Sequence, residues 1–459
     1  MDIEILVKTL IAEVRTLQKE NAIQKKAIEI QDKEIADLRA RLSRYEHPKT
    51  SQNSHLPSSK DPIGTQKVNL RQKTGRPVGG QKGHVGKTLT MQKPDEIIDL
   101  CACFCTHCGE DLSAVEARML EIRQEIDLPP IRPIVKEYHK MRKVCQCGWV
   151  NDGEFPVGVN SRISYGSGVE AAVTYFNIRQ RLPYQRLTDT MNEFCGLSMS
   201  PGTIGNILDR MVYRTSPAFE TIRLGLTTSP VIGADETTCS VNGKTMWAWV
   251  IQNKQLTYIK AGLTRKKEEF EKMMPEGLPM SVLVTDCLAG YFSANVKTHQ
   301  ICTSHILRDL IYASQLYEKQ TWSKRMKQLI LDALQLRKDA VGKIDTTRIQ
   351  ERLQVLLDEP IDKAHEKIKT LQKRLIKYRD YLFYFLEDEN VPPDNNASER
   401  AIRAFKIKLK NSGCFRSLTG AQGFAQLHSI ADTACKNGQS PLLAFQIAAT
   451  IRLRDNCLL

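Results

Sequence analysis

Two short apolar runs each end in an acid: Pro230-Val-Ile-Gly-Ala-Asp235 and Val282-Leu-Val-Thr-Asp286. Between them, Trp247-Ala-Trp-Val-Ile251 and Leu256-Thr-Tyr-Ile259 have the composition of two further strands, and a helix is expected around Glu268-Glu-Phe270. The intervening chain is long enough for a three-stranded meander, a helix and a return strand beside the first. The pattern predicts an α/β fold with both acids at the carboxyl edge of a sheet, where open α/β sheets build their sites.

A third acid stands in the run Pro392-Pro-Asp-Asn-Asn-Ala-Ser-Glu399-Arg400. The prolines stop the preceding helix, and Asp394 or Asn395 can cap a new helix with Glu399 in its first turns. The spacing places three basic residues on the same face as Glu399, namely Arg403, Lys406 and Lys410. These residues and Arg400 are the expected phosphate contacts of the helix. A separate apolar stripe is formed by Ile402, Phe405 and Leu409.

The three acids favour metal-dependent chemistry on phosphodiesters. Clustered carboxylates repel one another, and divalent metal usually offsets that cost. Two Mg²⁺ or Mn²⁺ ions about 3.5 to 4 Å apart stabilise the attacking and leaving oxygens of a phosphodiester, and such ions prefer hard oxygen ligands. Asp235, Asp286 and Glu399 are therefore the predicted catalytic metal ligands. A single Asp at a strand end is more often a turn residue or a cap, and Glu236 competes with Asp235 for the role.

The composition is that of a soluble globular protein with a polyanionic partner. The chain has 459 residues, enough for two to four domains, and 41% of them are hydrophobic. Its 66 Lys and Arg against 52 Asp and Glu give a net charge of +14, which favours nucleic acid as the partner. There is no signal peptide and no apolar run of about 18 to 20 residues. The 13 Cys are scattered, as reduced thiols are, so we expect a cytoplasmic protein.

The first 46 residues have a heptad pattern. The residues at alternating spacings of four and three from Ile3 to Leu42 are apolar except for Asn21, Gln24 and Gln31. Asn21 falls at an a position, where a buried Asn fixes register and two-stranded pairing. Residues 1–46 are therefore predicted to form a coiled coil that joins two copies of the chain or more. An amphipathic helix packed on its own domain is the alternative.

A basic segment rich in Pro and Gly follows over residues 47–94. Between Lys60 and Lys93 it holds eight basic residues and one acid, a charge that would neutralise phosphates without reading bases. Gly75-Arg76-Pro77 resembles the core of hooks that enter an A·T minor groove. The residues expected to contact DNA are Lys73, Arg76, Lys82 and Lys87. A merely solvated flexible linker is the alternative.

Residues 95–160 contain two tight cysteine pairs, Cys105-Thr-His-Cys108-Gly109 and Cys145-Gln-Cys147-Gly148. Tetrahedral zinc needs four thiolates or imidazoles at about 2.3 Å, and close pairs on Gly-containing turns supply two ligands each. We predict a zinc ribbon with one structural Zn²⁺ on Cys105, Cys108, Cys145 and Cys147. Nearby substitutes as ligands are Cys101, Cys103 and His107. Unliganded buried Cys and CxxC redox chemistry are the alternatives.

Residues 161–226 are predicted to be helical and to bind DNA. The segments from Tyr184 to Phe194 and from Pro201 to Tyr213 have helical composition, and Ser200 can cap the second. The pair fits a helix-turn-helix, whose second helix would lie in a major groove. Its exposed face carries few basic residues, chiefly Arg210 and Arg214, so plain packing is an equal alternative.

Together these motifs resemble those of the insertion sequence sixty-six family of bacterial DDE transposases, over nearly the whole chain. The residues that carry the resemblance are Ser54-His-Leu-Pro-Ser-Ser-Lys60, Gly79-Gly-Gln-Lys-Gly-His84, the paired Cys motifs, Ala234-Asp-Glu-Thr237 with Trp247-Ala-Trp249, Thr285-Asp286 with Gly290-Tyr291, Cys302-Thr-Ser-His305, and Asp394-Asn-Asn-Ala-Ser-Glu-Arg400 with Lys436-Asn-Gly438.

The resemblance implies a ribonuclease-H-like catalytic core that is split by a helical insertion. The first part of the core then spans 227–306, the insertion 307–388, and the second part, with C-terminal helices, 389–459. The same resemblance implies that the three acids are the metal ligands of this core.

Cys302 and His305 are similar to a Cys-x2-His pair that supports the site in several such families. A structural or DNA-contacting role is expected for them rather than a second zinc, since only two ligands are in sight. The family often has basic residues after that His, whereas this chain has Ile306-Leu307 before Arg308.

The sequence therefore predicts a transposase that binds terminal inverted repeats, cleaves a phosphodiester at the element end and transfers the freed 3′ hydroxyl to target DNA. The expected partners are double-stranded DNA, further copies of the chain and accessory proteins of the element, at the nucleoid of a bacterial cell. One alternative is a non-catalytic DNA-binding regulator derived from a transposase. Another is a metal-dependent nuclease that cuts without joining.

Zinc binding by the cysteine pairs is testable on the purified protein. Structural zinc sites contribute on the order of 10 kcal/mol to folding, so the ribbon should lose its fold when stripped of metal. Metal analysis of Cys145→Ser and Cys147→Ser proteins should show the loss of one zinc. Unchanged zinc content in both would transfer the ligand role to Cys101, Cys103 or His107, or remove it.

Overall fold

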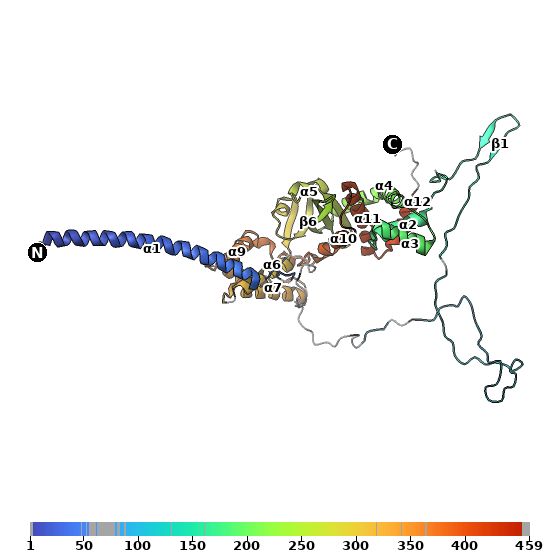
Figure 1. The fold of residues 1–459 in the computed structure, drawn as a ribbon, viewed down its shortest axis with the longest axis horizontal. Coiled ribbons are helices and arrows are strands. Elements are labelled where there is room, and N and C mark those ends of the chain that lie inside the picture. The colour runs from blue at the N-terminus through green and yellow to red at the C-terminus, as the bar shows by residue number, and fades with distance from the viewer. Residues whose placement is uncertain are drawn as a thin grey trace.

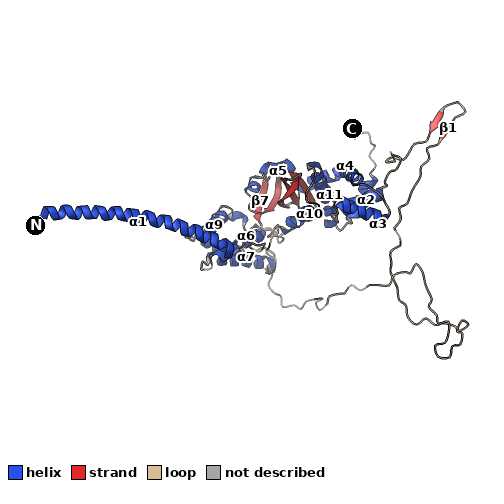
Figure 2. Cartoon of the chain, viewed as in Figure 1, coloured by secondary structure: helices blue, strands red, loops and turns tan. Residues whose placement is uncertain are grey.

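The computed structural model describes residues 3–46, 48–51, 53–54, 61, 79, 83–86, 89–129, 131–159, 161–317, 319–340, 342–362 and 365–451. The chain is a mixed α/β protein in which a five-stranded sheet packs against helices, with a long helix and an extended segment projecting from this body (Figure 1, Figure 2). The predicted DNA contacts of the basic arm, Lys73, Arg76, Lys82 and Lys87, lie outside the described residues.

The sheet has the strand order β5-β4-β3-β6-β7. Its strands are β3 (Val231–Val241), β4 (Lys244–Gln252), β5 (Thr257–Gly262), β6 (Leu278–Thr285) and β7 (Val296–Ile301). β3, β4 and β5 form an antiparallel meander, and α5 (Lys267–Met273) leads to β6, which returns parallel to β3. The predicted meander, helix and return strand are confirmed. β7, which pairs parallel with β6 after the short 3-10 helix η2 (Ala289–Ser293), is an additional strand that the sequence did not indicate.

β3 does not end at Asp235, so the expectation of a strand that ends in this acid is wrong. The strand continues to Val241 because it pairs with β4 along its length, through a turn at Asn242 and Gly243 with φ values of 48° and 74°. Asn-Gly is the preferred pair for such a left-handed hairpin turn. What stops near Asp235 is the parallel pairing with β6, whose last register pair on this strand is Gly233 with Val284.

Three helices precede the sheet: α2 (Ser167–Ile178), α3 (Tyr184–Cys195) and α4 (Pro201–Thr227). The predicted cap is confirmed, since the Ser200 hydroxyl accepts a hydrogen bond from the Thr203 amide at 3.1 Å. α4 runs well past the expected end at Tyr213. Arg210 and Arg214 of α4 both bond the buried carboxylate of Glu170 in α2. These two guanidinium groups therefore hold the helices together, which favours packing over base reading for this segment.

Between β7 and the third acid the chain forms helices, as expected for an insertion. They are α6 (Thr303–Leu316), α7 (Trp322–Asp339), α8 (Thr347–Asp358), α9 (Glu366–Lys377) and the 3-10 turns η4 (Arg379–Tyr381) and η5 (Tyr384–Leu386). Val282 and Val284 of β6 pack in the core of these helices, whereas Leu283 packs in the core of the rest. Alternate residues of β6 thus join two hydrophobic cores across one strand.

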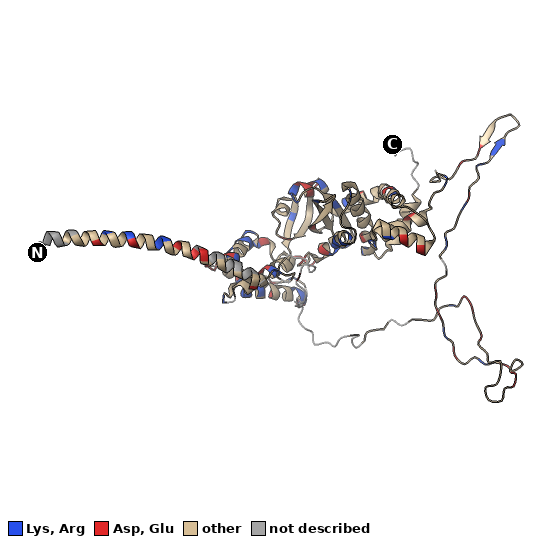
Figure 3. Cartoon of the chain, viewed as in Figure 1, with Lys and Arg blue, Asp and Glu red and all other residues tan. Residues whose placement is uncertain are grey.

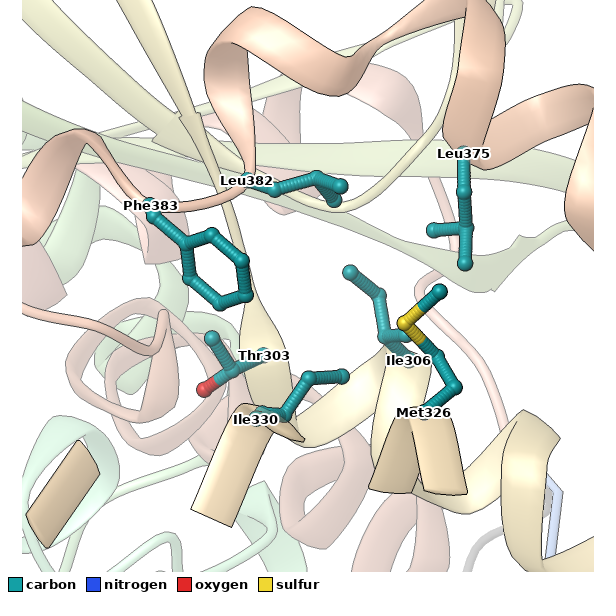
Figure 4. A pocket seen from close by; sticks show the side chains of 7 residues that line it. All are labelled: Thr303, Ile306, Met326, Ile330, Leu375, Leu382 and Phe383. Atoms are coloured by element: carbon teal, nitrogen blue, oxygen red, sulfur yellow. The ribbon is translucent and has the colours of Figure 1, made fainter. Parts of the chain in front are cut away.

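A small apolar gap lies inside the insertion. Figure 4 shows the side chains that surround it, which come from α6, α7, α9 and the segment after α9: Thr303, Ile306, Met326, Ile330, Leu375, Leu382 and Phe383. The hydroxyl of Thr303 donates to the carbonyl of Pro393 at 2.9 Å. The lining offers no charged group to a ligand, so the gap belongs to the packing that ties the insertion to the loop before the third acid.

The C-terminal part adds α10 (Asn396–Ser412), α11 (Leu418–Lys436) and α12 (Pro441–Thr450). α10 lies on β3 and β4, α11 lies on β5 and α4, and α12 lies on α2. The helix that carries the third acid therefore packs directly on the strand that carries the first.

The N-terminal helix α1 (Ile3–Glu46) extends away from the body (Figure 1). Its apolar heptad residues are exposed, with Val14 at 49% and Leu17 at 59%. Two residues that follow α1 contact the insertion: the Asn53 side-chain amide donates to Gln315 Oε1 at 2.8 Å, and the Lys49 ammonium lies 5.7 Å from the centre of the Tyr312 ring. No helix of the described residues is long and apolar enough to span a membrane.

Self-association through α1 follows from this exposed apolar seam. Isolated residues 1–46 should be helical and dimeric at micromolar concentration, by circular dichroism and analytical ultracentrifugation. In the full chain, Leu17→Glu should weaken dimerisation because a charge would enter the seam. Thr16→Glu adds the same charge on an adjacent position outside the seam and serves as the control. A monomeric, unstructured peptide, or equal effects of both substitutions, would contradict the coiled coil.

Candidate active site

The three predicted acids come from three elements that the fold brings together. Asp235 lies within β3, Asp286 is the residue after β6, and Glu399 is in the first turn of α10. In the parallel pair, Gly233 is opposite Val284, so Asp235 and Asp286 both lie two residues beyond that pair. The register of β3 with β6 thus sets the two acids of the sheet side by side.

The acids interact electrostatically with one another. Burial raises the pKa of the Asp235 carboxyl well above its ordinary value, and the negative charges of Glu236, Asp286 and Glu399 raise it further. Ionised Asp235 is therefore held in a buried and strongly negative environment.

The donor set fits a divalent cation. Three carboxylates supply the hard oxygen ligands that Mg²⁺ and Mn²⁺ prefer, and a cation would relieve their mutual repulsion. Within the described part of the chain, however, no three His, Cys, Asp or Glu side chains lie close enough to form a finished metal site. The structure brings the acids into one neighbourhood without closing them on a common point.

Glu399 is held by α6. Its Oε1 accepts a hydrogen bond from Arg308 Nη2 at 3.1 Å and lies 3.4 Å from His305 Nε2. The predicted support residue His305 therefore lies at the third acid. Ile306 and Leu307 are buried in the core of the insertion, and Arg308 is the first basic residue after His305. Among the described residues none donates to Oε2 of Glu399.

Cys302 is a buried structural thiol at the start of α6. Its Sγ accepts a hydrogen bond from the Asn395 amide at 3.2 Å, and its own amide donates to the carbonyl of Thr285 at 2.8 Å. Burial raises the pKa of the thiol to about 12, so it stays protonated at neutral pH. A protonated thiol is a poor zinc ligand, and its contacts instead link the end of β6 to the start of α10.

A buried chain of polar side chains joins α10 to β3. The Asn395 Nδ2 donates to the carbonyl of Ala234 at 2.6 Å, directly before the first acid. The Ser398 hydroxyl donates to Asn395 Oδ1 at 2.6 Å, and Gln252 Nε2 donates to Ser398 Oγ at 3.1 Å. Lys436 of α11 completes the chain with a bond from its ammonium to Gln252 Oε1 at 2.7 Å.

Gly233 makes room for this chain. A Cβ at that position would lie 2.6 Å from Gln252 Nε2, 2.6 Å from Ser398 Oγ and 2.8 Å from Asn395 Oδ1. Only glycine therefore allows α10 to approach β3 so closely. Sequence reasoning did not select Asn395, Ser398 or Gln252 as site residues, although the first two stand in the same motif as Glu399.

Glu236 is engaged elsewhere. Its carboxylate accepts hydrogen bonds from the Tyr291 hydroxyl and from Arg265, whose Nε and Nη2 lie 2.8 and 2.6 Å from Oε1. Since these donors already satisfy Glu236, the geometry favours Asp235 over its neighbour as a metal ligand.

The predicted basic face of α10 is exposed. Arg400, Arg403, Lys406 and Lys410 are all exposed, whereas Ile402 and Phe405 are buried and Leu409 is half-buried. Figure 3 colours Lys and Arg blue along the ribbon of the chain. Lys408 belongs to neither face: it is buried with its ammonium 5.6 Å from the Phe424 ring, and burial lowers its pKa to about 8.

The two cysteine pairs occupy similar turns. The Gly109 amide donates to the carbonyl of Cys105 and the Gly148 amide to that of Cys145, each at 2.8 Å, and both glycines have positive φ. Cys145 and Cys147 lie in the turn between β1 (Arg142–Val144) and β2 (Val150–Asp152).

Backbone amides favour thiolates in both turns. Hydrogen bonds from the backbone of Cys108 and His107 lower the pKa of Cys105, and one from the backbone of Cys147 lowers that of Cys145. Each turn fits two ligands of a zinc ion, but the described structure does not gather three of these side chains in one group.

A protein-family model described as "Transposase IS66 family" matches residues 162–423. The match covers more than half of the chain and includes all three acids, while α1 and the cysteine pairs lie outside it. No curated protein matches the chain.

The environment of Asp235 predicts that ionisation of its carboxyl lowers the free energy of unfolding. A pKa that is raised in the folded state means that stability falls as the pH rises from the ordinary Asp value of about 3.9 towards the folded value. Without divalent metal at pH 7, Asp235→Asn should therefore unfold at a higher temperature than the wild type, by about 2 to 4 °C per kcal/mol gained. Calorimetry should show this gain fading near pH 3.5.

The control is Glu193→Gln, which removes an exposed acid of α3 and should leave the unfolding temperature unchanged. An Asp235→Asn protein no more stable than the wild type at pH 7 would mean that the carboxylate is not strained.

Proposed function

Because the chain belongs to the IS66 family of transposases, we propose that it is the DNA transposase of an insertion sequence and that Asp235, Asp286 and Glu399 are its catalytic acids. Family membership implies DNA as the partner and a divalent metal as the cofactor. The observation that supports the assignment is electrostatic: the charges of Glu236, Asp286 and Glu399 all act on buried Asp235. Because these charges and burial raise the pKa of Asp235, ionising that carboxyl lowers the stability of the fold.

The residues of the chain would act by holding and orienting. Two Mg²⁺ or Mn²⁺ ions would supply activation of the attacking oxygen and neutralisation of charge on the phosphodiester. Asp235 and Asp286 offer oxygens from the sheet, and Glu399 offers them from α10. Arg308 and His305 orient Glu399 through its Oε1. The exposed face of α10, with Arg403, Lys406 and Lys410, would bind the DNA backbone.

The remaining segments of the chain fit other functions of a transposase. The meander with two parallel strands added supports a ribonuclease-H-like core over 227–306 and 389–459, with the helices of 307–388 as its insertion. We assign dimerisation to residues 1–46, a DNA-binding arm to 47–94 and a structural Zn²⁺ ribbon to 95–160. The two preformed cysteine turns support the last assignment.

A non-catalytic regulator derived from a transposase is the main rival. Such a protein would keep its DNA-binding parts and would not need strain at Asp235 or a buried polar chain beside Glu399. A nuclease that cuts without joining would need the same acids, and only a strand-transfer assay with a 3′-hydroxyl end separates the two activities.

Replacing each acid by its amide tests the proposal. The amide keeps the shape but removes the charge that would hold the metal, so Asp235→Asn, Asp286→Asn and Glu399→Gln should each reduce cleavage and joining by at least about 100-fold. DNA binding should survive, because phosphate contacts come from Lys and Arg elsewhere. The assay is Mg²⁺-dependent release of a 3′ end and its joining to a plasmid, with gel-shift affinity at fixed salt.

The matched control is Asp394→Asn, since an Asn at that position can still accept the bond that Asp394 receives from the Asn396 amide. Glu236→Gln is unsuitable as a control because that carboxylate has structural partners. Full activity in one amide variant would remove that residue from the metal site, and full activity in all three would refute the mechanism.

A further inference from the structure

Glu236 is a buried carboxylate that the proposed chemistry does not use. Its side chain is 1% exposed, yet it lies next to the first acid of the site. The fully buried Tyr291 hydroxyl bonds one oxygen, Oε2, and Arg265 bonds the other through Nε and Nη2. A buried charge of this kind needs partners to be tolerated, and here Tyr291 and Arg265 supply one to each carboxylate oxygen.

Arg265 is fixed on two sides. Its guanidinium is bonded to Glu236 on one edge and lies 5.1 Å from the centre of the Trp247 ring. The loop that carries it is anchored by a hydrogen bond from Trp249 Nε1 to the carbonyl of Thr264 at 3.2 Å. An arginine held in this way has already lost most of the freedom that binding a ligand would remove.

The other edge of Arg265 faces outward. The side chain is 44% exposed, and its Nη1 has no hydrogen-bond partner among the described residues. A guanidinium carries five N–H donors, and Glu236 uses those of only two nitrogens. Among the three acids of the candidate site, the charge of Asp286 acts on this guanidinium and raises its pKa, while Glu236, which Arg265 bonds, directly follows Asp235 in β3.

We propose that Arg265 binds a non-bridging oxygen of a DNA phosphate on the Asp286 side of the site, and that Glu236 and Tyr291 are positioning residues that fix its guanidinium. The inference rests on the proposed function, since it names a substrate contact of the same site. Three carboxylates repel a phosphodiester, and a fixed arginine within the electrostatic range of Asp286 offsets part of that repulsion. Arginine suits the task because its planar fork matches phosphate oxygens.

The test is a double-mutant cycle between protein and DNA. The probe is a duplex carrying the end of the element that encodes the chain, with single phosphates near the scissile bond replaced in turn by uncharged methylphosphonates. Binding is measured without divalent metal. Arg265→Gln should weaken binding to the unmodified duplex by roughly 10- to 100-fold, and the loss should largely vanish at one methylphosphonate position. Arg265→Lys should restore only part of the affinity.

Lys266→Gln is the matched control, because it removes the same charge from the adjacent, exposed residue. Its effect should be similar at every methylphosphonate position. Glu236→Gln and Tyr291→Phe should lose part of the same phosphate-specific coupling, and Glu236→Gln should add little once Arg265 is Gln. Equal losses at all phosphates in these two variants would show a structural role and remove the positioning assignment.

If the loss of binding free energy from Arg265→Gln is simply additive with the loss from the methylphosphonate at every position, Arg265 does not contact a phosphate, and the proposal is wrong. This outcome is distinct from failure of the proposed function, because the cycle measures binding alone. A fully active Asp235→Asn protein would refute the catalytic assignment whatever the cycle gives. An inactive Asp235→Asn protein together with an additive cycle would refute the role of Arg265 only.

Discussion

The hydrogen bond from the Asn395 side chain to the carbonyl of Ala234 fixes the third acid relative to the first. An insertion of several helices separates these residues in the chain, and a connection of that length leaves their relative position undetermined. The buried hydrogen-bond chain through Ser398 and Gln252 fixes the position of α10 on β3 instead. A shift of α10 would leave several buried polar groups without partners at once. Gly233 permits that contact, so the geometry of the site depends on the absence of one side chain.

Contacts of the same kind tie the second acid to the third. The amide of Cys302 bonds the end of β6 and its sulfur accepts from the amide of Asn395, while Thr303 bonds the carbonyl of Pro393. α6 therefore begins between the loop of Asp286 and the loop that leads to Glu399. Because the helices between β7 and α10 pack their core against β6, they also hold the end of β6 and the start of α10 in place relative to each other.

Local patterns in the sequence predicted what local forces decide. Strand and helix order around Asp235 and Asp286, the cap at Ser200 and the two faces of α10 follow from alternation, capping and helical spacing. Long-range contacts could not be read in this way. The hydrogen bonds of Arg308 to Glu399 and of Arg265 to Glu236 connect residues far apart in the chain. Likewise, Arg210 and Arg214, which suggested base recognition by α4, are hydrogen-bonded to Glu170 of α2. The extension of β3 to Val241 had a local signal in the sequence, since Asn242-Gly243 is a typical hairpin turn. The prediction instead ended the strand at Asp235.

Arg308 and Arg265 also separate the acids into those with an ion-pair partner and those without one among the described residues. Glu399 is paired with Arg308 and Glu236 with Arg265, so each of these carboxylates has a neutralising partner in the folded chain. Asp235 and Asp286 form no ion pair among the described residues, and burial together with the negative charges nearby raises the pKa of Asp235 well above its ordinary value. Since a paired carboxylate gains less from a cation than an unpaired one, the need for positive charge concentrates on the two acids of the sheet. In the proposed site, Asp235 and Asp286 would therefore gain most from a bound cation, and Glu399 would join them already oriented by Arg308 and His305.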